Sequence, residues 1–364
     1  MNRTVYLHIG APKTGTTYVQ DRLALNARSL ARHDVHVPTR PLVSPGLFHF
    51  RAALDLLGQD WGGEPGHAEG GWDALVKRVR RSSGTVVVSH EVLAPAFPEH
   101  VERAMRDLAD CEVHVVYSAR DLARQLPAAW QESIKRGRRW SFRAFLKQAE
   151  GEGPWFLQAF DLPQVLGTWG ASLPPERVHV VTVPQRRPAP GAEDLLWLRM
   201  CAAFGIDPAW APRDSDRANR SLGIAETQVV RRLNRRIDRA TRREVAYDDL
   251  IREKLAQDQL VRRRSVPVRL PPDHFDWAEE RAQQWIDWLA GSGVDVIGDV
   301  EDLRPVRPAA GERWHNPDKV RAKVQLNAAL DALAVMTHEA ARRPDPQRRL
   351  VARARTRARR LGRS

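Results

Sequence analysis

The stretch TVYLHIGAPKTGTT, residues 4–17, decides the fold. Residues 4–9 are mostly β-favouring and end at a glycine, residues 10–16 resemble a turn, and residues 17–31 have the apolar spacing of a helix. A glycine-bearing turn between a strand and a helix directs backbone N–H groups and the positive end of the helix dipole at one point. The pattern therefore predicts a phosphate site, to which Lys13 adds a positive charge. Hydroxyl donors are available from Thr14, Thr16 and Thr17.

This turn is a near match to the nucleotide-binding P-loop, G-x-x-x-x-G-K-S/T. Gly10 and Gly15 have the required spacing, but Thr16 stands where that motif requires lysine, and the lysine lies at position 13 instead. A kinase or ATPase needs the missing lysine for the β- and γ-phosphates of its nucleotide. The sequence therefore favours a loop for a single terminal phosphate over a loop for a magnesium triphosphate.

Short valine-rich runs alternate with helical segments through the first half of the chain. Apolar runs of this kind are typical of parallel strands that are buried on both faces. We therefore predict an α/β fold with a P-loop-like central parallel sheet flanked by helices, and additional helices beyond about residue 193. The expected strands are 4–9, 34–38, 85–89, 112–118 and 177–183, and the expected helices are 17–31, 73–81, 99–109, 122–136, 142–150 and 162–173. Residues 41–72 are rich in Pro, Gly, His and Trp with weak periodicity, and we expect a long excursion over the active-site face.

The composition is that of an ordinary globular protein, with 364 residues of which 42% are hydrophobic and 28% charged. Two cysteines, Cys111 and Cys201, are too few for a disulfide framework or a four-cysteine metal site. No apolar run approaches the roughly 18 residues of a membrane span, and the N-terminus does not resemble a signal peptide. We therefore expect a cytoplasmic protein without a transmembrane segment.

We expect residues 1–310 to form the α/β domain, residues 311–341 to form a C-terminal helix packed on it, and residues 342–364 to form an exposed arginine-rich tail. The residues expected to face the domain from that helix are Val320, Val324, Leu326, Leu330, Leu333, Ala334 and Met336. The tail holds ten arginines and one aspartate, so nine of the thirteen net positive charges lie there. Such a segment is either a passive tail or a contact for anionic surfaces, and a contact made by charge alone would be strongly salt-dependent. We expect no specific nucleic-acid partner, and the sequence leaves the oligomeric state open.

The segment Pro12-Lys13-Thr14-Gly15-Thr16-Thr17 resembles the 5′-phosphosulfate loop of sulfotransferases that use 3′-phosphoadenosine-5′-phosphosulfate (PAPS), P-K-S/T-G-T-S/T. The resemblance implies a P-loop-like α/β fold, in-line transfer of a sulfuryl group to a hydroxyl or amine, and release of 3′-phosphoadenosine-5′-phosphate (PAP). The acceptor would be a small molecule, a carbohydrate or a lipid, and the family's reaction requires no metal. The residues that would hold the 5′-phosphosulfate are Lys13, Thr14, Gly15, Thr16, Thr17 and Tyr18.

The same resemblance implies a 3′-phosphate site at Arg120, which follows the strand expected at 112–118. The family has a serine eight residues later, where this chain has Ala128, so the second contact is missing or comes from Ser133 or a backbone N–H. A loop later in the chain, residues 217–223, offers a looser match in which Arg220 would contact the cofactor. Apart from this resemblance, Arg120 and Asp121 would be interpreted as a salt link at the N-terminus of the helix expected at 122–136, with Asp121 as its cap.

Removal of the acceptor's proton requires a base, and Ser89-His90-Glu91 follows the strand 85–88 at the carboxyl end of the sheet, where ligands bind in open α/β folds. The family uses a histidine or a glutamate near this point, so His90 is the preferred base and Glu91 the alternative. Two other functions stay open: a P-loop kinase that uses ATP and Mg²⁺, and a non-catalytic protein that binds polyanions. The sequence does not identify the acceptor.

Overall fold

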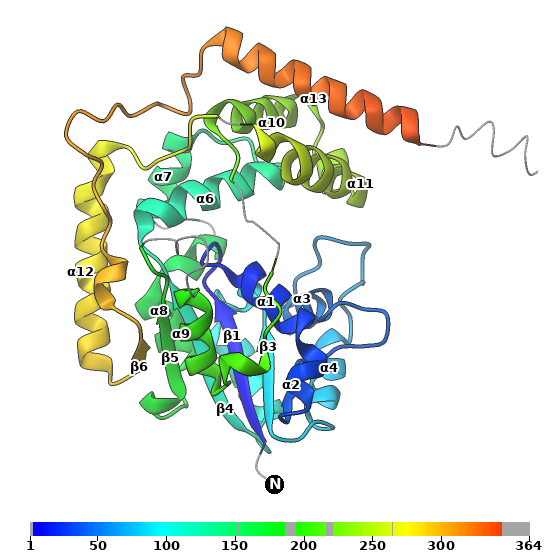
Figure 1. Ribbon diagram of the computed structural model, residues 1–364, viewed down its shortest axis with the longest axis vertical. Coiled ribbons are helices and arrows are strands. Elements are labelled where there is room, and N and C mark those ends of the chain that lie inside the picture. Colours follow the sequence, from blue (N-terminus) through cyan, green and yellow to red (C-terminus); the bar gives the residue numbers. More distant parts are fainter. Residues whose placement is uncertain are drawn as a thin grey trace, which may run out of the picture.

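A single parallel sheet forms the centre of the protein (Figure 1) in the computed structural model, which describes residues 3–151, 153, 155–185, 194–215, 221–263 and 265–343. Its strand order is β2-β3-β1-β4-β5-β6 and every neighbouring pair is parallel. The strands are β1 Thr4–Gly10, β2 Val35–His36, β3 Thr85–Ser89, β4 Glu112–Ala119, β5 Val178–Thr182 and β6 Asp295–Ile297. The predicted α/β class, with a central parallel sheet flanked by helices, is confirmed.

The valine runs are continuous because each strand is buried on both faces. In β3, Val86 and Val88 belong to one apolar cluster, whereas Val87 belongs to the other. In β4, Val115 and Val116 divide between the two clusters in the same way. Since successive side chains of a strand point to opposite faces, two separate cores require apolar residues at every position.

The helices cover both faces of the sheet and its carboxyl edge. Helices α1, α2 and α9 supply one apolar cluster, and α3, α4, α5 and α8 contribute to the other. Figure 1 shows α6, α7, α10, α11 and α13 beyond the end of the sheet to which β1 points, with α12 beside β6. The bounds are α1 Thr16–Leu25, α2 Ala27–Ala31, α3 Pro45–Leu56, α4 Gly71–Val79, α5 Pro98–Asp107, α6 Leu122–Lys135, α7 Phe142–Glu150, α8 Leu162–Trp169, α9 Leu195–Phe204, α10 Ile224–Arg236, α11 Val245–Tyr247, α12 Phe275–Ser292 and α13 Ala322–Arg342.

The described chain also contains a π-helix and eight short 3₁₀ turns. They are the π-helix η6 Asp248–Gln259 and the turns η1 Glu91–Leu93, η2 Trp155–Phe160, η3 Pro175–Arg177, η4 Pro208–Trp210, η5 Thr241–Arg243, η7 Leu260–Arg262, η8 Pro272–His274 and η9 Val300–Leu303. Among the described residues, none of the helices combines the length and the apolar character needed to cross a bilayer.

The excursion expected at residues 41–72 contains a helix, α3, that the sequence did not indicate. Ser44 caps this helix by accepting a hydrogen bond from the Leu47 N–H, and Pro45 occupies its first turn. Phe48 and Leu56 are among its buried residues. The cap and the buried side chains outweigh the weak periodicity of the surrounding Pro- and Gly-rich sequence.

The first helix and the last strand also differ from the prediction. The helix expected at 17–31 is divided into α1 and α2 at Asn26, whose side-chain amide donates to the carbonyls of Arg22 and Arg213. The short strand β6 was missed. Its three residues are exposed or half-buried, so they lack the apolar run by which the other strands were found.

Helix α13 packs on the body of the protein through a different face from the one predicted. It contacts α10 and η6, and its buried residues are Gln325, Ala328 and Ala332. Of the predicted face, Val324, Leu326, Leu330 and Leu333 are exposed, with Leu330 at 54% and Leu333 at 63%, whereas Met336 is half-buried and packs against the core. The small alanine side chains allow the helices to approach closely, and the leucines then point away. The predicted tail lies outside the described residues from position 344 onward.

This packing predicts opposite effects for two substitutions in α13. Leu330→Glu should change the free energy of unfolding by less than about 0.5 kcal/mol, because the side chain is already exposed. Ala328→Glu should destabilise by more than about 2 kcal/mol, because it places an unpaired charge against α10. Urea denaturation, with hydrogen exchange in α13, measures both effects. A larger loss of stability for Leu330→Glu would show that Leu330 is buried, as the sequence predicted, and would contradict the packing described here.

Candidate active site

The loop between β1 and α1 lies at the carboxyl edge of the sheet. Lys13 has φ 68° and Gly15 has φ 99°, so both residues adopt left-handed backbone conformations. Glycine is favoured at position 15 by this φ, which L side chains rarely adopt, and a Cβ there would also displace the Leu196 side chain of α9, whose Cδ2 would lie 2.7 Å away. A left-handed lysine is unusual, and backbone conformations of this kind are concentrated at functional sites.

Ser118, near the end of β4, holds the base of this loop. Its carbonyl accepts from the Ala11 N–H at 2.9 Å, and its hydroxyl donates to the Gly10 carbonyl at 2.9 Å. The Thr14 hydroxyl donates to the Ala11 carbonyl at 2.6 Å and lies 2.5 Å from the Ser118 hydroxyl. Thr14 is only 2% exposed. The Thr14 hydroxyl, expected as a phosphate donor, is therefore used to hold the loop.

Two side chains of the β4–α6 region hold loop carbonyls on the outside of the turn. The Arg120 guanidinium donates to the Lys13 carbonyl at 2.8 Å, and the Gln125 amide donates to the Pro12 carbonyl at 2.9 Å. Arg120 therefore lies directly beside the loop, as a phosphate-binding arginine would. Ser133 does not offer the second contact, because its hydroxyl donates to the Trp130 carbonyl and accepts from the Trp140 indole.

The N-terminus of α1 is open toward the loop. Gly15 occupies the N-cap position and no side chain of the described chain caps this end. The first N–H groups of a helix have no partner within it, and they attract anions together with the helix dipole. Thr16 and Thr17, in this first turn, lie where the sequence placed them, and Thr17 is half-buried.

Lys13 forms an ion pair with Glu132 of α6, a residue that the sequence did not single out. Lys13 Nζ lies 3.1 Å from Glu132 Oε2. The same carboxylate contacts Lys135 at 2.6 Å, Arg136 at 3.4 Å and Arg252 at 3.2 Å. Burial alone would raise the pKa of Glu132, but these four cations hold that pKa well below its usual value. The loop lysine is therefore tied to a buried carboxylate that has an excess of positive charge around it.

His90 and Glu91 leave β3 in different directions. The His90 ring lies 5.1 Å from the Phe50 ring, and its Nδ1 atom accepts from the Val92 N–H at 3.2 Å. Burial lowers the pKa of His90, Glu91 opposes this effect, and Arg136 adds to it. The histidine is therefore neutral at neutral pH, and its proton is on Nε2 because Nδ1 is the acceptor.

Glu91 faces the phosphate loop. It accepts a hydrogen bond from the Thr16 hydroxyl and a longer one, at 3.5 Å, from the Gln20 amide. Burial would raise the pKa of Glu91, but His90, a backbone hydrogen bond, the Thr16 hydroxyl and the Lys13 charge lower it below its usual value. Glu91 is therefore a carboxylate within reach of the loop.

Tyr18 points away from the loop. Its hydroxyl accepts from Arg22 at 2.8 Å and donates to Asp214 at 3.2 Å. Burial raises the pKa of Tyr18, and the nearby Asp194 carboxylate adds to the rise. The side chain therefore packs α1 against the segment before residue 216. Arg220, the third predicted cofactor contact, lies outside the described residues.

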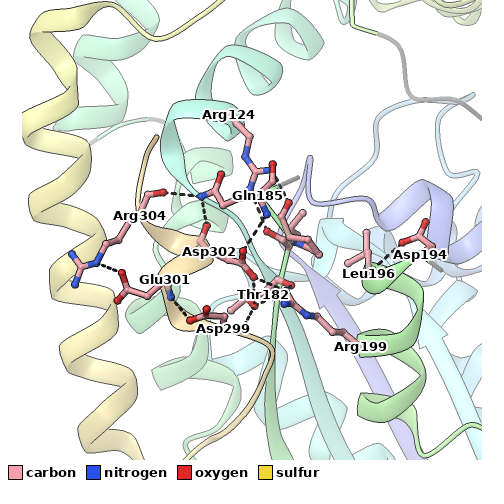
Figure 2. Close-up of polar contacts among 12 residues, drawn as sticks. Arg124, Thr182, Gln185, Asp194, Leu196, Arg199, Asp299, Glu301, Asp302 and Arg304 are labelled. Carbon is pink, nitrogen blue, oxygen red and sulfur yellow. Dashed lines mark hydrogen bonds and ion pairs between the residues drawn. The ribbon is translucent and has the colours of Figure 1, made fainter. Parts of the chain in front are cut away.

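Other arginines at this edge hold the end of β5 (Figure 2). Arg124 donates to the Val183 and Pro184 carbonyls at 3.2 and 2.8 Å. Arg199 and the Thr182 hydroxyl both contact the Asp302 carboxylate, at 2.5 and 3.2 Å. These groups position the strand end and are not directed at the phosphate loop.

No protein-family model, no curated protein and no solved structure matches the chain. Among the described residues, no group of three or more His, Cys, Asp or Glu side chains is arranged to hold a metal ion. The function must therefore be argued from the site itself.

Two buried histidines under the site make a pH dependence of stability predictable. His8 lies 2.8 Å from the Ser89 hydroxyl, and His49 lies 2.9 Å from the Pro38 carbonyl. Burial lowers the pKa of each to about 4, whereas an unfolded histidine has a pKa near 6.5. As the pH falls below about 6.5, the unfolded chain takes up these protons first, so folding stability is lost progressively toward pH 4.

Urea denaturation at pH 7.5 and pH 5 should therefore show a loss of about 2 kcal/mol for each of these histidines. His49→Gln should make the profile flatter, since one of the two titrating groups is removed. Equal stability of the wild type at both pH values would contradict the neutral, buried state of these rings.

Proposed function

We propose that this chain is a PAPS-dependent sulfotransferase, which moves a sulfuryl group from PAPS to a hydroxyl or amine of its acceptor. The observation that supports this best is the loop itself. It combines the sequence PKTGTT with an α1 N-terminus that no side chain of the described residues caps. Its lysine, Lys13, forms an ion pair with the buried Glu132 carboxylate. Arg120, beside the loop, is suited to the 3′-phosphate that distinguishes PAPS from ATP.

Lys13 exchanges one anion for another in this proposal. Without donor it is paired with Glu132, and the phosphosulfate bound at the α1 N-terminus competes for the same ammonium group. In the reaction the acceptor oxygen or nitrogen forms a bond to sulfur while the bond from sulfur to the phosphate oxygen breaks. The developing charge on the leaving PAP phosphate is stabilised by Lys13 and the first N–H groups of α1.

The tautomer of His90 supports Glu91 as the base, the reverse of the preference from sequence. With its proton on Nε2, His90 can donate to the acceptor but cannot accept a proton there. Glu91 is ionised, and a bound phosphosulfate places negative charge near it while engaging Lys13. Both effects raise its pKa toward the range that general-base catalysis needs. Glu91 then takes the acceptor's proton as the new bond to sulfur forms.

The first test of the proposal is transfer of label from PAPS by Lys13→Ala. With ³⁵S-labelled PAPS and a panel of acceptors, this variant should lose at least about a hundredfold in turnover, because the change removes charge stabilisation from the transition state. Lys147→Ala, at an exposed position of α7, is the matched control and should retain full turnover. A loss below tenfold for Lys13→Ala, or transfer of label from γ-³²P-ATP instead, would contradict the proposal.

Variants at the base should separate the two candidate roles. Glu91→Gln should lower turnover by at least about a hundredfold and remove the acidic limb of the pH–rate profile. His90→Ala should chiefly raise KM for the acceptor, since it removes a hydrogen-bond donor. If His90→Ala is the variant that loses the acidic limb, the histidine is the base.

A further inference from the structure

Three cations next to Lys13 form a second positive feature of the site. We call Lys135, Arg136 and Arg252 the α6–η6 cluster. All three contact Glu132, and Arg252 also contacts Glu253 at 3.0 Å. Together with Lys13 there are four cations. The carboxylates that face them are Glu132, Glu253, which is 49% exposed, and Asp248 beside Arg252, while Glu91 faces Lys13.

The α6–η6 cluster is partly buried. The Lys135 side chain is only 8% exposed, and its ammonium group donates to the Gln257 amide oxygen at 3.2 Å. Burial lowers the pKa of Lys135, Glu132 opposes this effect, and Lys13 and Arg252 add to it. Arg136 is the most exposed of the three cations, at 37% against 8% for Lys135 and 23% for Arg252. Arg136 is therefore the member of the cluster best placed to meet an anion that arrives from outside the chain. Arg252 comes from the π-helix η6.

The cluster lies beyond the place assigned to the donor. Arg120 precedes α6 and Arg136 follows it, and the 14 residues of this helix span about 21 Å. Glu132, between them, contacts Lys13, which marks the sulfuryl end of the donor in the proposed function. The donor therefore extends from Lys13 toward Arg120, and the end of α6 lies on the acceptor side.

Aromatic side chains connect this cluster with His90. The Arg136 guanidinium lies 5.2 Å from the centre of the Trp61 ring. Phe50 contacts both Trp61 and His90, with ring centroids 5.3 and 5.1 Å apart. A face of this kind is suited to a planar or sugar ring, and Arg136 is positioned for a charged substituent of that ring.

We propose that the α6–η6 cluster is the acceptor subsite and that the acceptor is a ring compound with an anionic substituent, a carboxylate or a sulfate. The identification of the bound molecule as the sulfuryl acceptor rests on the proposed function, whereas the anion subsite itself can be tested without it. The same oxyanion chemistry could be supplied by the donor's own phosphates, and the experiment separates the two sources.

The test is calorimetry with p-nitrophenyl β-D-glucuronide and its neutral analogue p-nitrophenyl β-D-glucoside, with and without PAP. The wild type should bind the glucuronide at least tenfold more tightly than the glucoside. Arg136→Gln and Arg252→Gln should lose this preference while their affinity for PAP is unchanged. Arg136→Lys should retain part of the preference, since it keeps the charge. Arg235→Gln, an exposed arginine of α10, is the matched control.

Equal affinity for the two sugars, or binding of neither, would overturn the proposal. A loss of PAP affinity in Arg136→Gln and Arg252→Gln would assign the cluster to the donor and would overturn it as well. If PAP does not bind the wild type but the glucuronide preference is present and depends on Arg136, the anion subsite stands and the sulfotransferase proposal fails. Arg136 is 37% exposed, so its substitution should leave the fold intact.

Discussion

The ion pair between Lys13 and Glu132 connects the two halves of the site. Lys13 belongs to the loop that follows the central strand, and Glu132 belongs to the helix that crosses above the carboxyl edge of the sheet. A buried carboxylate needs compensating positive charge, and here four cations supply it together, so that three remain when one of them is replaced. The loop geometry and the position of α6 therefore depend on each other.

Helix α6 sets the order in which the binding groups of the site lie. Asp121 caps its beginning, and Arg120, just before it, donates to the loop. Its last turns carry the charges that meet η6 and the aromatic side chains of the β2–α3–α4 region. A rigid helix thus places donor-side and acceptor-side groups in a fixed order along one axis. This order is the structural basis for both the proposed reaction and the proposed acceptor subsite.

The parts of the site that could be predicted from sequence are those fixed by local patterns. The β1–loop–α1 unit and the valine runs of β3, β4 and β5 are local, and the sheet follows from them. Glu132 could not be found this way, because its partners Lys13 and Arg252 lie about 120 residues away on either side. Its spacing from Lys135 and Arg136 is an ordinary helical ion-pair pattern. The tertiary use of the Thr14 hydroxyl by Ser118 was equally invisible, since it depends on how β4 pairs with β1.

The measurement that tests the central claim most directly is calorimetric titration of the protein with PAP and with 5′-AMP, which lacks the 3′-phosphate, in the absence of magnesium. If the loop binds the 5′-phosphate of PAP and Arg120 binds its 3′-phosphate, PAP should bind at least tenfold more tightly than 5′-AMP. In Arg120→Ala this difference should disappear, because PAP loses its 3′-phosphate contact. A loss of affinity common to both nucleotides would report the contact of Arg120 with the Lys13 carbonyl. Equal affinity of the wild type for the two nucleotides, or tighter binding of ATP with magnesium than of PAP, would contradict the account.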